Sequence, residues 1–260
     1  MDDGDWTLFT IDKSRIEFSP KGLPEGRHRL EIAVKAIDGN GDRWLPPLRS
    51  AIVFSGFEPD ANAKIEPRSP AGQKPFIEFL GDSITQGEGI LHTSGGAVIN
   101  SDALAAYAWL TGEALGTTHV QIAFGGSGVI RSGSGNVPPA PSSFAWRFSG
   151  SPADFSVVPD FILINLGTND QYPSDEFVPA YAKLLREIRR HYARTVIFAI
   201  RPFMATVTMA TMSPTLSRRC RTQGLSISTQ PVGWMKATSQ MVPIPMYPAL
   251  AKPRHIWKKL

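Results

Sequence analysis

The sequence predicts an α/β fold with a mostly parallel sheet between layers of helices, preceded by a small β-rich domain. After residue 74, short apolar runs alternate with helical stretches, a pattern typical of a doubly wound sheet. The run from Asp160 to Leu166 is almost entirely apolar, as expected of a strand covered on both faces. Before residue 60, the runs are short, rich in β-branched and aromatic residues, and separated by turn residues.

The β-rich part is expected to cover residues 1–60, with strands at 6–9, 15–18, 28–36 and 51–57. Residues 28–36 alternate between apolar and polar side chains, which indicates a half-buried antiparallel strand. A stretch rich in Pro, Gly and Lys follows, and we interpret residues 61–74 as a linker.

The α/β part is expected to cover residues 75–203. Strands are predicted at 75–80, 119–124, 160–166 and 195–200, and helices at 102–115 and 174–192. The second helix is the better defined of the two because its apolar residues recur on one face: Phe177, Tyr181, Leu184, Leu185, Ile188 and Tyr192.

Composition places the chain among globular proteins, with 42% hydrophobic and 19% charged residues over 260 positions. The single cysteine, Cys220, excludes a disulfide framework and a Cys-rich metal site. No run of about 18 apolar residues occurs, so no membrane span is expected. The start MDDGDWTLFT lacks the basic flank and apolar core of a signal peptide. The chain as written is therefore expected in the cytoplasm, and secretion would require a different N-terminus.

The last 60 residues differ in composition from the rest of the chain. Residues 201–260 contain nine Lys and Arg, six of the seven Met, and no Asp or Glu. Their positive charges are scattered among Met, Pro and Thr rather than clustered, so nucleic acid is not an expected partner. We treat residues 204–260 as an anomalous tail.

Three polar motifs that contain glycine follow three of the predicted strands. They are Gly81-Asp-Ser-Ile-Thr85, Gly125-Gly-Ser-Gly128 and Gly167-Thr-Asn-Asp170. Ligands of open parallel sheets bind beyond the carboxyl ends of the strands, so these motifs predict a single site there.

The residue types in these motifs favour acyl transfer. Ser83 offers a hydroxyl where a strand turns into a helix, whose N-terminus favours negative charge near Oγ. Gly128 lets a backbone N–H approach a ligand closely, and Asn169 offers a side-chain donor. A hydroxyl with two or three converging donors is the composition of a nucleophile with an oxyanion hole.

These three blocks, in this order and spacing, resemble those of the GDSL/SGNH hydrolase superfamily over residues 75–203. The resemblance implies a three-layer, flavodoxin-like α/β/α domain that uses neither metal nor cofactor. It also implies that Ser83 is the nucleophile and that the Ser83 N–H, the Gly128 N–H and the Asn169 amide form the oxyanion hole. The β-rich part, ending at 53–58, resembles the jelly-roll domain of the second carbohydrate esterase family, shortened at its N-terminus.

The resemblance fails at the last block of the superfamily, Asp-x-x-His, in which His is the general base and Asp orients it. No Asp lies beyond Asp175, and Lys252 stands three residues before the only late histidine, His255. No general base is therefore identifiable. His92, in the loop after Ser83, is better interpreted as a surface residue.

Other residues in the motifs have structural interpretations. Asp82 and Asp170 are expected to support the site, Asp82 by bracing the turn and Asp170 as a hydrogen bonder rather than a base. Ser83 itself could be a plain helix N-cap. Trp146 and Phe148 could line a sugar cleft, although packing is the simpler interpretation.

We interpret the sequence as a serine esterase, in particular a carbohydrate O-acetyl esterase, that is inactive or impaired as written. A monomer acting on a small-molecule or polysaccharide ester is expected, without nucleic acid or membrane. Two alternatives stay open: a non-catalytic carbohydrate-binding relative, and an acyl-thioesterase or lysophospholipase.

The genetic code offers an explanation for the missing block. When the last base of each codon in residues 240–246 is joined to the first two bases of the next, the new codons admit Asp-Gly-Thr-His-Pro-Asn. The same shift forces Asp at Trp234–Met235 and Glu at Met235–Lys236, which restores acidic residues. We therefore interpret the tail as the rest of the hydrolase domain in a shifted reading frame.

Sequencing of the transcript across codons 195–260 tests this hypothesis. We expect a frame change after about Phe203 and an alternative frame that encodes an Asp-x-x-His block. An unshifted frame would contradict the hypothesis, as would ordinary esterase turnover by the purified 260-residue chain.

Overall fold

Four parallel strands form the centre of the structure. The computed structural model describes residues 2, 4–11, 15–60, 62–66, 74–91, 98–170, 174–200 and 202–203. The helices and strands of these residues are β1 (Phe76–Gly81), α1 (Ser83–Gln86), η1 (Val98–Asn100), η2 (Ala103–Ala105), α2 (Tyr107–Ala114), β2 (Thr118–Ala123), α3 (Ala140–Ser143), β3 (Trp146–Phe148), β4 (Ser151–Pro152), β5 (Phe161–Asn165), α4 (Ser174–His191) and β6 (Val196–Ala199).

The central sheet has the order β2-β1-β5-β6, and each neighbouring pair is parallel. This arrangement confirms the predicted α/β fold and its four strands. A short antiparallel pair, β3 and β4, lies apart from it. The predicted helix at 174–192 is α4. The one predicted at 102–115 is divided into η2 and α2 by Ala106, which has extended backbone.

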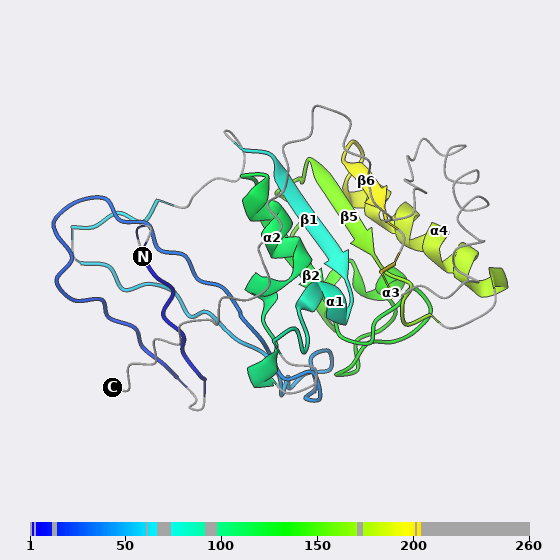
Figure 1. The fold of residues 1–260 in the computed structure, drawn as a ribbon, viewed down its shortest axis with the longest axis horizontal. Helices are drawn as coiled ribbons and strands as arrows, with labels where there is room; N and C mark the ends of the chain where they lie inside the picture. The colour runs from blue at the N-terminus through cyan, green and yellow to red at the C-terminus, as the bar shows by residue number, and fades with distance from the viewer. Residues whose placement is uncertain are drawn as a thin grey trace.

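The two faces of the sheet have separate cores. On one face, Leu80 and Ile164 pack against the apolar side of α4, which includes Leu184 and Ile188. On the other face, Ile77 and Phe79 pack against Ala108 of α2. Figure 1 shows α2 and α4 on opposite sides of the sheet. Burial on both faces explains why these strands are apolar nearly throughout.

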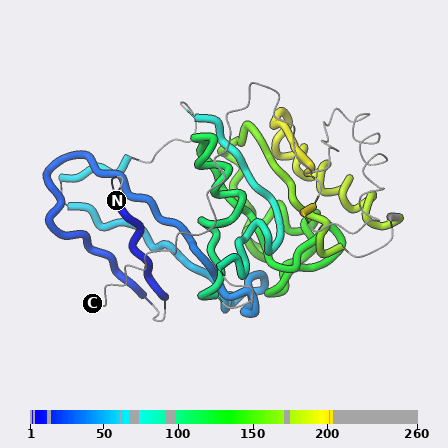
Figure 2. The backbone as a smooth tube through the Cα atoms, in the orientation of Figure 1, coloured from blue at the N-terminus to red at the C-terminus, as the bar shows by residue number. Residues whose placement is uncertain are grey.

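The β-rich domain expected over residues 1–60 is not confirmed. The described residues before β1 contain no strand, although they run back and forth as extended segments (Figure 2). Many of their large apolar side chains are exposed, among them Trp6, Phe9, Ile32 and Val53. Alternating sequence gives stable strands only when a second layer covers the apolar face, and the described chain supplies none here.

One part of this region does pack on the α/β part. Within residues 38–50, the side chains of Arg43, Trp44 and Ser50 are buried. Most of the expected linker at 61–74 lies outside the described residues, and so does the whole tail at 204–260.

The buried Glu78 predicts how stability depends on pH. Its side chain is on β1, 3% exposed, and its Oε2 accepts a hydrogen bond from the Tyr192 hydroxyl at 3.4 Å. Burial raises the pKa of Glu78 from 4.5 to about 7. Because the folded state holds this proton more tightly, the stability it contributes is complete below about pH 4.5 and is lost as pH rises through about 7.

Glu78→Gln should therefore be more stable than the parent above pH 7, by about 1–3 kcal/mol, and the difference should shrink towards pH 5. Urea unfolding at pH 5, 7 and 8.5 measures it. The matched control is Glu113→Gln on the exposed side of α2, which should leave the curve unchanged. Equal pH dependence in Glu78→Gln and the parent would contradict this account.

Candidate active site

The three motifs lie at one edge of the sheet, as the sequence predicts. Gly81, the last residue of β1, is paired with Ala123 of β2 on one side and with Asn165 of β5 on the other. The loops that follow these three strands therefore leave the sheet at the same level.

Ser83 lies in a tight turn between β1 and α1. The N-cap of α1 is Asp82, whose Oδ1 accepts a hydrogen bond from the Ile84 N–H at 3.0 Å. The interpretation of Ser83 as a plain N-cap is therefore wrong, and Asp82 braces the turn as expected. Since α1 is a single turn of four residues, its dipole adds little at Ser83. Ser83 is half-buried, and within the described chain neither its N–H nor its Oγ has a hydrogen-bond partner.

Asp170 holds the loop that follows Gly128. Its buried carboxylate accepts the backbone N–H groups of Val129 (2.8 Å), Ile130 (2.8 Å) and Arg131 (3.0 Å). A Cβ at Gly128 would overlap this carboxylate, so glycine is required there. These bonds favour the structural interpretation of Asp170 over a role as general base.

Asn169 links the three motifs. Its Nδ2 donates to the Ser127 carbonyl at 2.9 Å and to Oδ2 of Asp82 at 3.3 Å. The Gly128 N–H donates to the Arg131 carbonyl at 3.0 Å. Of the three expected oxyanion donors, the Ser83 N–H is therefore open, and the other two are engaged within the protein.

Burial raises the pKa of Asp82 to about 6, against the lowering effect of the hydrogen bond from the Ile84 N–H. The negative charge of Asp170 adds a smaller upward effect on the same pKa. This carboxyl group accepts bonds from Ile84 and Asn169, and no bond joins it to Ser83. It therefore supports the turn and the amide, as expected of a bracing residue.

The described histidines contact residues other than Ser83. His28 bonds Asp2 and the Pro24 carbonyl, His119 contacts Trp109 and the Thr117 carbonyl, and His191 stacks on Phe155 and bonds Glu187. His92 and His255 lie outside the described residues. No group of three or more His, Cys, Asp or Glu in the described chain could hold a metal ion.

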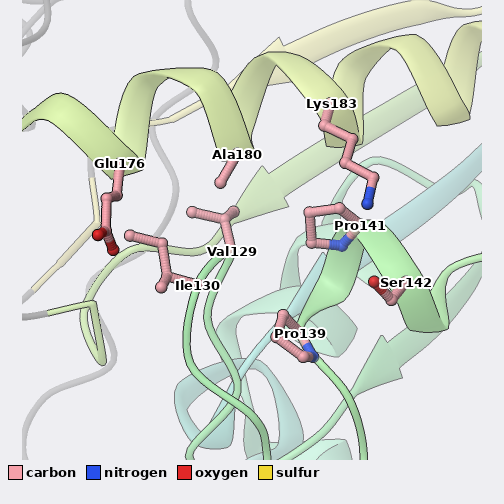
Figure 3. Close-up of a pocket in the computed structure, with 8 residues that line it drawn as sticks. All are labelled: Val129, Ile130, Pro139, Pro141, Ser142, Glu176, Ala180 and Lys183. Carbon is pink, nitrogen blue, oxygen red and sulfur yellow. The ribbon is translucent and has the colours of Figure 1, made fainter.

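A hollow of about 270 Å³ lies behind the Gly128 loop, between α3 and α4 (Figure 3). It is lined by Val129, Ile130, Pro139, Pro141, Ser142, Glu176, Ala180 and Lys183. Ser83 is not among these residues. Trp146, 41% exposed on β3, and the half-buried Phe148 lie elsewhere, and their role as a sugar-cleft lining stays a prediction. No described helix has the length and apolar character needed to cross a bilayer.

Two polar residues at this edge were missed in the sequence. Gln86 accepts the Gly125 N–H through Oε1 at 2.8 Å, and Arg43 contacts Gln86 and Ser134. Gln86 follows Ser83 by three residues in the same helical turn, and this spacing could have identified Gln86 as a residue near the site. Arg43 carried no such signal because Ser134 lies 91 residues away along the chain.

A serine at a strand-to-helix turn, beside a glycine loop and an asparagine at the carboxyl edge of a parallel sheet, is an arrangement typical of serine hydrolases that act on ester bonds. Within that class, this chain belongs to the GDSL-like lipase/acylhydrolase family, which matches residues 79–225. The match runs beyond Phe203, so similarity to the family continues into the start of the tail that the sequence sets apart.

Related proteins include carbohydrate esterases. The chain is 31% identical over 188 residues to the cellulase/esterase CelE of Acetivibrio thermocellus, covering 68% of this chain and 22% of CelE. It is 31% identical to a family two carbohydrate esterase from Clostridium thermocellum solved with cellohexaose, with a TM-score of 0.51 over 60% of this chain and 54% of that one. An active-site mutant of a family two esterase from that organism gives 29% identity and a TM-score of 0.52, over 59% of this chain and 52% of that one. The chain thus spans about half of these solved structures and 22% of CelE.

The bonds of Asp170 predict a large effect of removing its charge. Asp170→Asn keeps the size of the side chain but replaces an acceptor by an NH₂ group that faces backbone N–H groups. We expect a loss of about 2–4 kcal/mol in the free energy of unfolding, measured with urea at pH 7. The control is Asp154→Asn, whose exposed Oδ1 accepts one bond from the Ser156 N–H and which should cost less than about 1 kcal/mol. Equal losses in the two variants would refute the role given to Asp170.

Proposed function

We propose that this chain is built as a carbohydrate O-acetyl esterase with Ser83 as its nucleophile. The observation that carries the proposal is the open turn at Ser83, where Oγ and the backbone N–H face no partner in the described chain, in a frame made by Asp82, Asn169 and Asp170. The similarity to CelE and to the family two esterases supports the carbohydrate substrate.

In the proposed reaction, Ser83 Oγ attacks the carbonyl carbon of the acetyl ester and gives its proton to a base. The tetrahedral oxyanion accepts the Ser83 N–H, and the Gly128 N–H and Asn169 amide join once they leave their internal acceptors. Collapse expels the sugar hydroxyl, which takes up a proton, and leaves acetyl-Ser83. Water then attacks this ester and releases acetate and free serine.

The base is the part that this chain does not supply in recognisable form. The described histidines have other partners, and the Asp-x-x-His block is absent from the sequence. The chain as written should therefore turn over slowly, because general-base catalysis contributes about 10²–10⁴-fold. The same absence favours a second candidate function, a carbohydrate-binding relative that does not turn over.

Ser83 can be tested without the missing base. At pH 9, an alkyl fluorophosphonate should label the chain slowly, since Ser83 Oγ displaces fluoride from phosphorus and the adduct oxygen meets the open Ser83 N–H. Intact mass and peptide mapping should place one adduct on Ser83. Ser83→Ala should remove it, and Ser142→Ala, at an exposed serine of α3, should label like the parent. An adduct that persists on another serine in Ser83→Ala would reject Ser83 as the nucleophile.

A further inference from the structure

Arg43 comes from the N-terminal region but is buried at the edge of the site, with 6% of its surface exposed. Its backbone N–H donates to the Gly135 carbonyl at 3.0 Å. Nη2 of its guanidinium donates to the carbonyl oxygen and to Oγ of Ser134, at 2.9 and 2.6 Å. The guanidinium also lies over the Phe124 ring, 5.3 Å from its centroid.

The partners of Arg43 reach both halves of the site. Nη1 donates to Oε1 of Gln86 at 3.5 Å, and Gln86 ends the helical turn that begins at Ser83. The same Oε1 accepts the Gly125 N–H at 2.8 Å. On the other side, Ser134 donates to the Gly125 carbonyl through its N–H at 2.8 Å and its Oγ at 3.0 Å. Gly125 is thus held at both polar groups of its backbone, three residues before Gly128.

Burying a guanidinium group that contacts no carboxylate lowers stability, so stability alone does not account for the buried Arg43. The acceptors of Arg43 are neutral, and its Nε has no partner within the described chain. Burial lowers the pKa of Arg43, and the charges of Glu88 and Asp38 offset this only in part. The guanidinium group is planar and carries several donors, so it can bridge two segments in a fixed geometry. An ammonium group or an apolar side chain cannot do so.

We propose that Arg43 is a positioning residue of the acyl-transfer site, which fixes the Ser83 turn against the loop that carries Gly128. Residues 38–50 then belong to the catalytic unit rather than to a separate binding module. This inference rests on the proposed function, since the geometry that Arg43 fixes is that of the nucleophile and its oxyanion donor.

Three variants test the proposal by the kinetics of fluorophosphonate labelling at pH 9. Arg43→Met removes the donors, Arg43→Lys keeps the charge without the fork, and Asn136→Ala is the matched control. Asn136 Nδ2 donates to Asp42 at 2.8 Å, so it joins the same two segments at an exposed position without touching Gln86 or Gly125. The first-order rate constant of labelling is separated from the apparent affinity for the probe, and the melting temperature is recorded.

Arg43→Met should lower the first-order constant at least 10-fold and leave the affinity within about 2-fold of the parent. Arg43→Lys should recover most of the melting temperature but not the rate. Asn136→Ala should label like the parent. Labelling of Arg43→Met at the parent rate would overturn the proposal, as would an equal loss in Asn136→Ala. If Arg43→Met does not fold, parent-like labelling of Arg43→Lys would overturn it.

Hydrogen exchange separates this inference from the proposed function. The Gly125 and Ser134 amides should exchange at least 10-fold faster in Arg43→Lys than in Asn136→Ala, whether or not Ser83 reacts. Absence of labelling in the parent would reject the proposed function and leave exchange to decide whether Arg43 joins the two segments. Parent-like exchange in Arg43→Lys would reject the inference about Arg43, even if Ser83 labels.

Discussion

The carboxylate of Asp170 is the constraint on which the rest of the site depends. It accepts three successive backbone N–H groups, from Val129 to Arg131, and its close approach excludes a side chain at Gly128. A buried charge solvated by N–H dipoles needs no cation, but it disfavours a second charge nearby. This contributes to the raised pKa of Asp82, which is otherwise a consequence of burial. The neighbouring Asn169 joins the two halves by donating to Asp82 and Ser127.

Contacts near the carboxyl edge of the sheet explain why one part of the N-terminal region packs on the α/β part while the rest exposes its apolar side chains. Residues 38–50 are attached by Arg43, Trp44 and Asp42, whose partners on the α/β part are Gln86 and backbone and side-chain groups at 134–149. The segments on either side expose Phe9, Ile32 and Val53. They contact the α/β part through Lys35, which bonds the Ser101 carbonyl and the Ala103 N–H, and through Trp6, whose ring lies against Trp109. The region is thus attached mainly by polar contacts at a few residues, and most of its large apolar side chains take no part in the attachment.

The sequence is informative where one local rule decides the outcome. Strands covered on both faces must be apolar, so β1 and β5 can be predicted from the sequence. Parallel pairing brings the ends of the strands together, so the motifs that carry Ser83, Gly128 and Asn169 converge. It is uninformative about which donor faces which acceptor, because Asp170 and Ile130 lie 40 residues apart. The internal bonds of Gly128 and Asn169 were therefore missed. The jelly roll is not confirmed, because alternation at 28–36 indicates a preference for half-burial but does not indicate whether a covering layer exists.

The residues that hold the site in place and the residues expected to supply its general base belong to different parts of the chain. Within the described residues, the contacts that hold Ser83, Gly128 and Asn169 in place come from residues 42–170, whereas the resemblance implies that the general base follows Phe203. The described hydrogen bonds that hold these residues all join groups within the same part of the chain. The general base that the resemblance implies needs one histidine near Ser83, and the sequence after Phe203 contains no Asp-x-x-His block to supply it. If the proposed function holds, a reading frame that shifts within the tail would leave the turn at Ser83 in place and remove only the proton acceptor, because none of the described bonds of that turn comes from the tail.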